Sequence, residues 1–200
     1  MTRIFLLRHG AVVQAETRRF IGHLDVPLSE VGERQGAAQG ARLAGSRLVA
    51  VFTSDLARAR RTGELIGAPH GLTPVLLPSL REMAMGRWDG LTAEEIQRRE
   101  PAAFAEWMGR VGEFPFPEGE SVPDLLARAW PAFETIVDGH RGQTVAVVAH
   151  GGTNRALLCR VFDLPLARLL AFGQDYGALT VLERGARSWR LARLNEPPVL

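Results

Sequence analysis

The chain of 200 residues contains no lysine, and all 24 of its basic residues are arginines. This absence excludes a Schiff-base lysine and the lysine of a P-loop, so two large classes of enzyme do not apply. The single cysteine, Cys159, cannot form an internal disulfide, and its apolar neighbours indicate a buried, inert thiol. This cysteine usage favours a reducing compartment.

Long hydrophobic runs are also absent. No stretch reaches the length of a transmembrane helix, and the N-terminus lacks the apolar region of a secretory signal. We therefore expect a cytoplasmic protein that does not bind a membrane. The arginines are interleaved with 22 acidic residues, so a nucleic-acid-binding stripe is not indicated. Cysteine pairs and an HExxH pattern are missing, and we expect no metal and no other cofactor.

What is present is a regular alternation of short apolar runs and amphipathic segments. The hydrophobic fraction of 46% suits one domain spanning residues 1–200. The runs expected to form strands are Ile4–Leu7, Val49–Thr53, Val75–Leu77, Thr144–Ala149, Leu179–Leu182 and Trp189–Leu194. Because helical segments lie between them, we predict an α/β fold with a mostly parallel central sheet sandwiched between helices on both faces. The short connection 183–187 predicts an antiparallel strand at the sheet edge.

The helices have recognisable starts. The expected helices are one capped by Ser29 and reaching Leu43, one from Ser54-Asp55 to Ile66, one with a capping box at Thr92–Glu95, one from Ser121 through Val137, and one over Thr153–Val161. Residues 84–120 interrupt the alternation, so they are a candidate lid or substrate-shaping insertion. For its irregular part, a plain surface connection is the alternative.

Charged residues follow four of the expected strands directly. Arg8 and His9 follow the first strand, Arg58 the second, Glu82 the third and His150 the fourth. In open α/β sheets, ligands bind beyond the carboxyl ends of the strands. We therefore expect these side chains to converge on one rim of the sheet.

The residue types at this rim suit phosphoryl transfer without a metal. Arginine forks match phosphate oxygens, and a neutral imidazole is a competent nucleophile toward phosphorus. A second, protonated imidazole can donate to the equatorial oxygens, and a glutamate can supply a proton to the leaving oxygen. Each residue alone also has a structural explanation; Arg58, for example, is at helix spacing from Asp55 and could simply pair with it.

Seven stretches of the sequence carry a family resemblance. They are Leu7–Gly10, Gly22–Gln35, Thr53–Ala59, Leu80–Met83, Gly86–Gly90, Gly119–Ser121 and Val148–Gly152. Taken in this order, they resemble the phosphoglycerate mutase-like branch of the histidine phosphatase superfamily over nearly the whole chain.

The resemblance implies that His9 is the nucleophile that becomes phosphohistidine and that Glu82 is the general acid and base. It further implies that Arg8, Arg58 and His150 complete the catalytic set. The implied phosphate and substrate pocket consists of Arg8, His9, Ile21, Gly22, Arg58, Glu82, His150 and Gly151. The chain lacks the asparagine that many members place after Arg-His-Gly, and Gln14 is the candidate replacement.

The expected activity is hydrolysis of a small-molecule phosphomonoester. The insertion is modest and its arginines are balanced by acids, whereas family mutases use extra cations there to hold the substrate carboxylate. Residues 86–90 and 117–121 resemble the branch that holds broad-specificity phosphatases and alpha-ribazole phosphatase, and 114–117 are a candidate apolar wall for a ring-bearing substrate. The alternatives are phosphoglycerate mutase activity and an inactive domain that binds phosphorylated ligands. A homodimer is compatible with the sequence.

Overall fold

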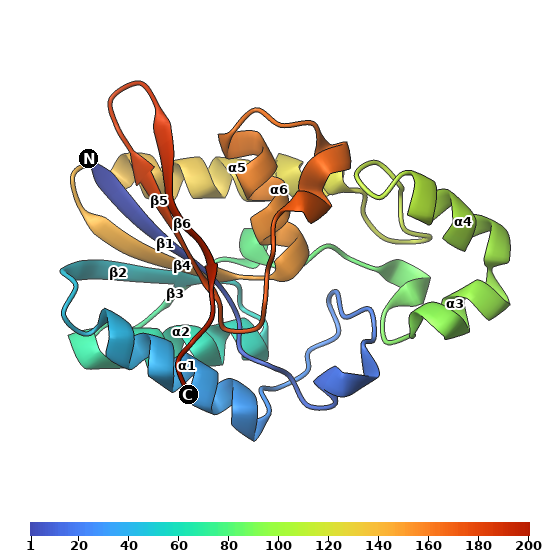
Figure 1. Ribbon diagram of the computed structural model, residues 1–200, viewed down its shortest axis with the longest axis horizontal. Coiled ribbons are helices and arrows are strands. Elements are labelled where there is room, and N and C mark those ends of the chain that lie inside the picture. The colour runs from blue at the N-terminus through green and yellow to red at the C-terminus, as the bar shows by residue number, and fades with distance from the viewer.

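A single mixed sheet organises the chain. The computed structural model describes all 200 residues, and its six strands lie in the order β3-β2-β4-β1-β5-β6 (Figure 1). The strands are β1 (Thr2–Arg8), β2 (Leu48–Thr53), β3 (Val75–Leu76), β4 (Thr144–Ala149), β5 (Leu179–Arg184) and β6 (Trp189–Glu196). The first four are parallel, whereas β5 is antiparallel to β1 and β6 is antiparallel to β5. The predicted fold class and the antiparallel edge strand are confirmed.

Alternate side chains of β1 enter two separate hydrophobic cores. Ile4 and Leu6 pack in the core formed with helices α5 (Val122–Gly139) and α6 (Gly151–Val161). Phe5 and Leu7 pack in the core formed with α1 (Glu30–Leu43) and α2 (Ala57–Gly67). Successive side chains of a strand point to opposite faces, and each buried Leu or Phe contributes about 1.5–3 kcal/mol. Helices therefore cover both faces of the sheet, as Figure 1 shows.

Three of the expected helix starts are confirmed. The Ser29 hydroxyl accepts a hydrogen bond from the Gly32 N–H at the start of α1. Thr92 and Ser121 each complete a capping box, with Glu95 and Asp124 respectively. These capping boxes open α3 (Ala93–Arg99) and α5.

The expected start of α2 is wrong. The helix begins at Ala57, not at Ser54-Asp55, and its N-cap residue Leu56 has no side chain that can cap it. The carboxylate of Asp25 accepts the Ala57 N–H instead, at 2.7 Å. This cap comes from a distant loop, so local sequence does not reveal it. Helix α6 likewise begins earlier than expected, at Gly151, with His150 as its N-cap residue.

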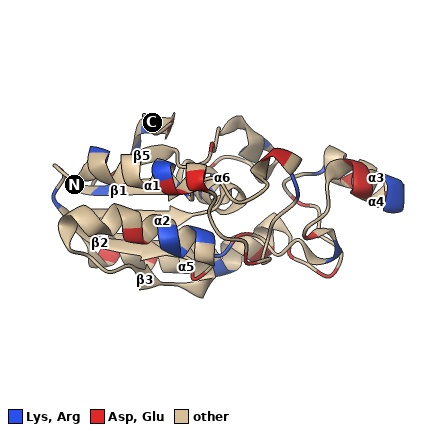
Figure 2. Cartoon of the chain, turned by 90° about the horizontal axis from the view of Figure 1, so that it is seen from below, with Lys and Arg blue, Asp and Glu red and all other residues tan.

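The segment 84–120 projects beyond the sheet. It carries α3 and α4 (Pro101–Gly109), which lie at the far right in both Figure 1 and Figure 2. Trp88 is completely buried within it and stacks on Phe114, with ring centroids 5.3 Å apart. Basic and acidic residues are interspersed along the chain (Figure 2). No helix combines the length and the apolar character that a bilayer span requires.

Candidate active site

Two histidines meet where β1 and β4 end. Arg8 and Ala149 are paired at the ends of these neighbouring strands, and His9 and His150 follow them. The ring centroids of the two histidines lie 5.1 Å apart. Both side chains are buried, with His9 at 5% exposure and His150 at 0%. Parallel pairing of the strands therefore brings together two residues that are 141 positions apart in the chain.

The ring of His9 is oriented by its own loop. Its Nδ1 lies 2.8 Å from the carbonyl oxygen of Gly10. A carbonyl only accepts, so Nδ1 carries the proton and the lone pair is on Nε2. Burial, followed by the charges of Arg58 and Arg8, lowers the pKa of His9 well below its usual value. The imidazole is therefore uncharged near neutral pH, which is the form that a nucleophile needs.

The second histidine is also uncharged. The Nε2 of His150 lies 2.7 Å from the Ser54 hydroxyl, and its buried Nδ1 has no hydrogen-bond partner. Burial, followed by Arg58, His9 and Arg8, lowers the pKa of His150 well below its usual value. A protonated His150 is therefore disfavoured in the absence of a ligand, because it would add a positive charge in a buried place among cations. A neutral imidazole still offers one N–H donor.

Arg58 is 1% exposed and lies in the first turn of α2. Its guanidinium donates to the carbonyl oxygens of Gly22 and Leu24, at 2.6 and 2.8 Å. It does not pair with Asp55, whose carboxylate binds Arg81 through two hydrogen bonds. The simple ion-pair explanation of Arg58 is therefore wrong. Instead, Arg58 ties the predicted substrate loop at Ile21-Gly22 to the rim.

Arg8 is stacked on the only tyrosine of the chain. Its guanidinium carbon lies 3.8 Å from the centroid of the Tyr176 ring, and Nη1 donates to the carbonyl oxygen of Gln174. The Nε of Arg8 is buried without a partner. The Nε–H group is therefore a buried, oriented donor that a ligand oxygen can use.

A third arginine, Arg155, belongs to the same site and was missed from the sequence. Its Nε donates to the Phe172 carbonyl oxygen at 2.9 Å. A methyl group placed on Gly151 would lie 3.2 Å from Nη1 of Arg155 and 3.5 Å from Nε of Arg8, so two guanidinium groups converge at this glycine. Gly151 and Arg155 are four residues apart on one helix and so lie on the same face, and this spacing could have indicated Arg155 from the sequence.

Glu82 lies over the N-terminus of α6. Its Oε2 accepts the Gly152 N–H at 2.8 Å, and its Oε1 accepts the N–H groups of Met83 and Thr153 at 2.9 and 3.1 Å. A helix N-terminus offers unpaired N–H groups and a positive dipole end, so it favours an acidic group at this place. The side chain is 7% exposed and lines the same cavity as His9.

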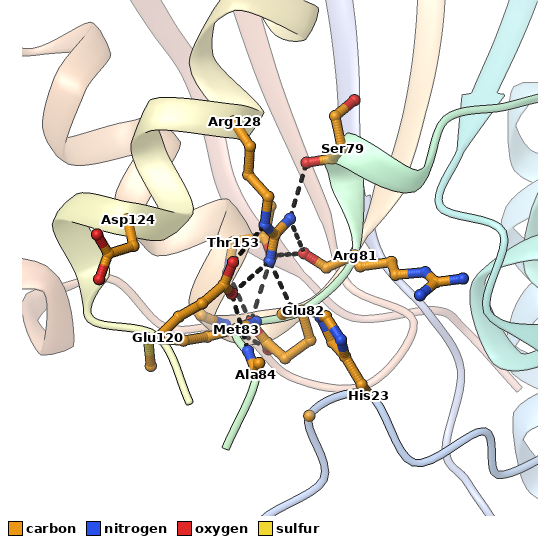
Figure 3. Close-up of polar contacts among 12 residues, drawn as sticks. His23, Ser79, Arg81, Glu82, Met83, Ala84, Glu120, Asp124, Arg128 and Thr153 are labelled. Carbon is orange, nitrogen blue, oxygen red and sulfur yellow. Dashed lines mark hydrogen bonds and ion pairs between the residues drawn. The ribbon is translucent and has the colours of Figure 1, made fainter. Parts of the chain in front are cut away.

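The backbone around Glu82 is held by an ion pair from another part of the chain (Figure 3). Arg128, on α5, donates to three carbonyl oxygens at 2.8–2.9 Å, those of Ser79, Arg81 and Glu82. The same guanidinium forms two hydrogen bonds with Glu120, whose carboxylate also accepts the Ala84 N–H. His23 adds a bond from Nε2 to the Glu82 carbonyl oxygen at 2.9 Å. In the sequence, only the motif Gly119–Ser121, which contains Glu120, pointed to this network of hydrogen bonds.

A cavity of about 290 Å³ collects these groups. Of the predicted pocket residues, all but two line it: Arg8, His9, Ile21, Arg58, Glu82 and Gly151. His150 lies buried beside His9, and Gly22 holds Arg58 through its carbonyl group. Gln14 is exposed and outside the cavity, so it does not replace the missing asparagine. Of the proposed apolar wall, Phe116 lines the cavity, whereas Phe114 is buried beneath it against Trp88.

Proteins of other organisms are similar to most of this chain. A bifunctional protein of Mycobacterium tuberculosis is 36% identical over 194 residues, covering 95% of this chain but only 53% of its own length. The chain thus spans about half the length of that relative. A metal-independent phosphoserine phosphatase of Arabidopsis thaliana is 35% identical over 164 residues, covering 80% of this chain and 69% of its own.

Among solved structures, a mycobacterial glucosyl-3-phosphoglycerate phosphatase in complex with VO3 superposes with a TM-score of 0.86. It is 31% identical, and the match covers 97% of this chain and 99% of that one. The family model of the histidine phosphatase superfamily (branch 1) matches residues 4–197. The chain therefore belongs to the histidine phosphatase superfamily, branch 1.

Proposed function

We propose that this protein hydrolyses small-molecule phosphomonoesters through a phosphohistidine on His9. The observation that carries the proposal is the free Nε2 lone pair of an uncharged His9 inside a cradle of buried cations and N–H donors. In the first step Nε2 bonds to phosphorus, the bond from phosphorus to the alcohol oxygen breaks, and Glu82 in its acid form gives that oxygen a proton. In the second step Glu82 takes a proton from water, which attacks phosphorus and releases phosphate and His9.

The remaining groups stabilise the charge of the transferred phosphoryl group. Arg8 Nε is a buried donor without a partner, and a ligand oxygen would satisfy it. The Nδ1 of His150 is also buried and unpaired, and it is a donor when the Ser54 hydroxyl donates to Nε2 of the same ring. Gly151 opens α6, which adds a backbone N–H and the positive end of the helix dipole. Arg58 supplies a further buried charge. Each donor is oriented before substrate binds, so little reorganisation is needed at the reaction step.

The position of the insertion arginines favours hydrolysis over mutase chemistry. Arg87 pairs with Glu100 and Glu118, and Arg110 pairs with Glu106 and Glu113, so neither lines the cavity. Phosphoglycerate mutase activity is the second candidate because Arg18 and Arg155 do line the cavity and form no ion pair with an acidic side chain. An inactive binding domain is disfavoured, since both His9 and Glu82 are present and positioned. We also propose a cytoplasmic location, because the single cysteine, Cys159, can form no internal disulfide.

The test is His9→Ala with p-nitrophenyl phosphate as substrate. Turnover should be abolished, and the acid-labile, base-stable phosphoryl label that forms on the parent protein during rapid quenching should disappear. His70→Ala is the matched control, because His70 lies in the turn Ala68–His70 away from the cavity. Retention of the parent rate by His9→Ala would remove His9 as the nucleophile. A panel with 3-phosphoglycerate and a ribazole phosphate, assayed for free phosphate against isomerised product, separates phosphatase from mutase.

A further inference from the structure

The charge around the cavity is strongly one-sided. Five arginines line it: Arg8, Arg18, Arg19, Arg58 and Arg155. The only acid in the lining is Glu82, and both of its oxygens already accept backbone N–H groups. No carboxylate in the cavity wall is left to meet a positively charged group of a substrate.

Acids on the segments around the cavity also have partners; Asp175, next to the lining residue Tyr176, accepts a hydrogen bond from Asn195 Nδ2. Asp89 accepts the N–H groups of Gly22 and Leu24, and Asp25 caps α2. Glu95 forms an ion pair with Arg19; Arg19 lines the cavity, whereas Glu95 does not. These carboxylates hold the loops around the site in place, so moving one of them toward a ligand would break its own hydrogen bonds.

The rest of the wall is apolar. Eleven of the twenty lining residues are hydrophobic, and the side chains that come from residues 20–21, 83–116 and 169–170 are Phe20, Ile21, Met83, Met85, Trp107, Val111, Phe116, Leu169 and Leu170. Phe20 makes an edge contact with Trp107 at a centroid separation of 5.2 Å, so part of this wall is a packed aromatic cluster. The cavity therefore combines the candidate phosphate-binding groups with a large apolar surface that comes from other segments.

We propose that the preferred substrates are phosphomonoesters whose organic part is apolar, ring- or chain-bearing, and free of any ammonium group. This inference rests on the phosphatase function proposed above. An ammonium group entering this cavity would lose its water without gaining a counter-ion, and it would face several guanidinium groups. An apolar body would instead leave water for an apolar wall. A carboxylate remains acceptable, because Arg18 and Arg155 form no ion pair with an acid.

This specificity differs from that named for the Arabidopsis relative, a phosphoserine phosphatase. Phosphoserine carries an ammonium group, and this cavity has no partner for it. On this inference, 35% identity over 164 residues does not carry the relative's substrate over to this chain.

Matched esters test the proposal. n-Propyl phosphate and O-phosphoethanolamine have nearly the same shape but differ by a methyl group in place of the ammonium group. 2-Phenylethyl phosphate and ethyl phosphate have similar leaving groups but differ by a ring. We expect kcat/KM at least about tenfold higher for the first member of each pair, the lower limit for a recognised apolar group. Equal values, or a preference for O-phosphoethanolamine, would overturn the inference.

A variant and a binding assay complete the test. Leu170 is 62% exposed at the cavity, so Leu170→Glu introduces a carboxylate without disturbing a core. It should raise the O-phosphoethanolamine to n-propyl phosphate ratio at least about tenfold more than Leu170→Gln does, because the glutamine removes the same apolar side chain without adding a charge. An unchanged ratio in Leu170→Glu counts against the inference.

Competition by n-butylphosphonate and 3-aminopropylphosphonate, followed calorimetrically, gives a readout that needs no turnover. Tighter binding of the butyl compound supports the inference even if no ester is hydrolysed, a result that would refute only the proposed function. Equal binding, or tighter binding of the amino compound, refutes the inference even if hydrolysis is fast.

Discussion

A substitution at Gly152 would displace the carboxylate of Glu82, the proposed general acid, with a moderate effect on the stability of the fold. A Cβ atom at this position would lie 2.5 Å from Glu82 Oε1 and 3.2 Å from the carboxyl carbon. Since ordinary contacts begin at 3.4 Å, the carboxylate of Gly152→Ala must move by about 1 Å. That movement breaks or lengthens its hydrogen bonds to the N–H groups of Gly152 and Thr153.

The two consequences differ in size. Each lost charge-assisted bond costs about 1.5–3 kcal/mol, and alanine in place of a helical glycine returns about 1 kcal/mol. We therefore expect the free energy of unfolding to fall by about 0.5–2 kcal/mol if one bond is lost and by about 2–5 kcal/mol if both are lost. A misplacement of about 1 Å should lower kcat for an alkyl phosphate roughly 100-fold, because its leaving oxygen needs the proton of Glu82.

The assay compares n-propyl phosphate with p-nitrophenyl phosphate, whose leaving group departs without a proton. The parameter compared is kcat/KM, which reports the first step only, because the second step uses Glu82 equally for both esters. The loss in kcat/KM should be large for the first ester and small for the second, and adding Glu82→Gln to Gly152→Ala should cause little further loss. Gly139→Ala is the control, because a Cβ there meets nothing within 4 Å. Equal losses on the two esters, or full activity of Gly152→Ala, would refute the role assigned to the carboxylate.

Two further predictions concern support and pH. Arg128→Lys keeps the positive charge but cannot make the five hydrogen bonds of the guanidinium to Glu120 and to the 79–82 backbone. It should lower kcat for alkyl phosphates about tenfold and cause little further loss when added to Glu82→Gln. Additive losses in the double variant would refute the view that Arg128 acts by positioning Glu82. Because His9 and His150 have lowered pKa values in the fold, the unfolded chain binds more protons than the folded protein below about pH 6.5. The free energy of unfolding should therefore decrease as the pH is lowered from there, by up to about 1.4 kcal/mol per pH unit for each histidine. Urea unfolding of His9→Asn and His150→Asn should show a weaker dependence on pH, and an unchanged dependence in both variants would contradict the prediction.

Local patterns in the sequence were sufficient for the architecture. The six apolar runs became the six strands, and the capping residues Ser29, Thr92 and Ser121 began helices where expected. These signals are read within a few residues, because period-2 burial and N-cap hydrogen bonds depend on near neighbours. The predicted start of α2 was wrong for the same reason, because the residue that caps this helix, Asp25, lies 32 residues before Ala57 in the chain.

For the site, the sequence by itself determined the candidate reactive groups, since Arg8, His9, Arg58, Glu82 and His150 could be named from strand ends and motifs. Only the tertiary structure decided their protonation and surroundings. The uncharged state of His150, the place of Arg155 beside Arg8, and the clamp of Arg128 on the Glu82 backbone all depend on contacts between distant segments. Burial and charge are properties of the assembled neighbourhood, so a linear pattern supplies the side chains but not the field in which they act.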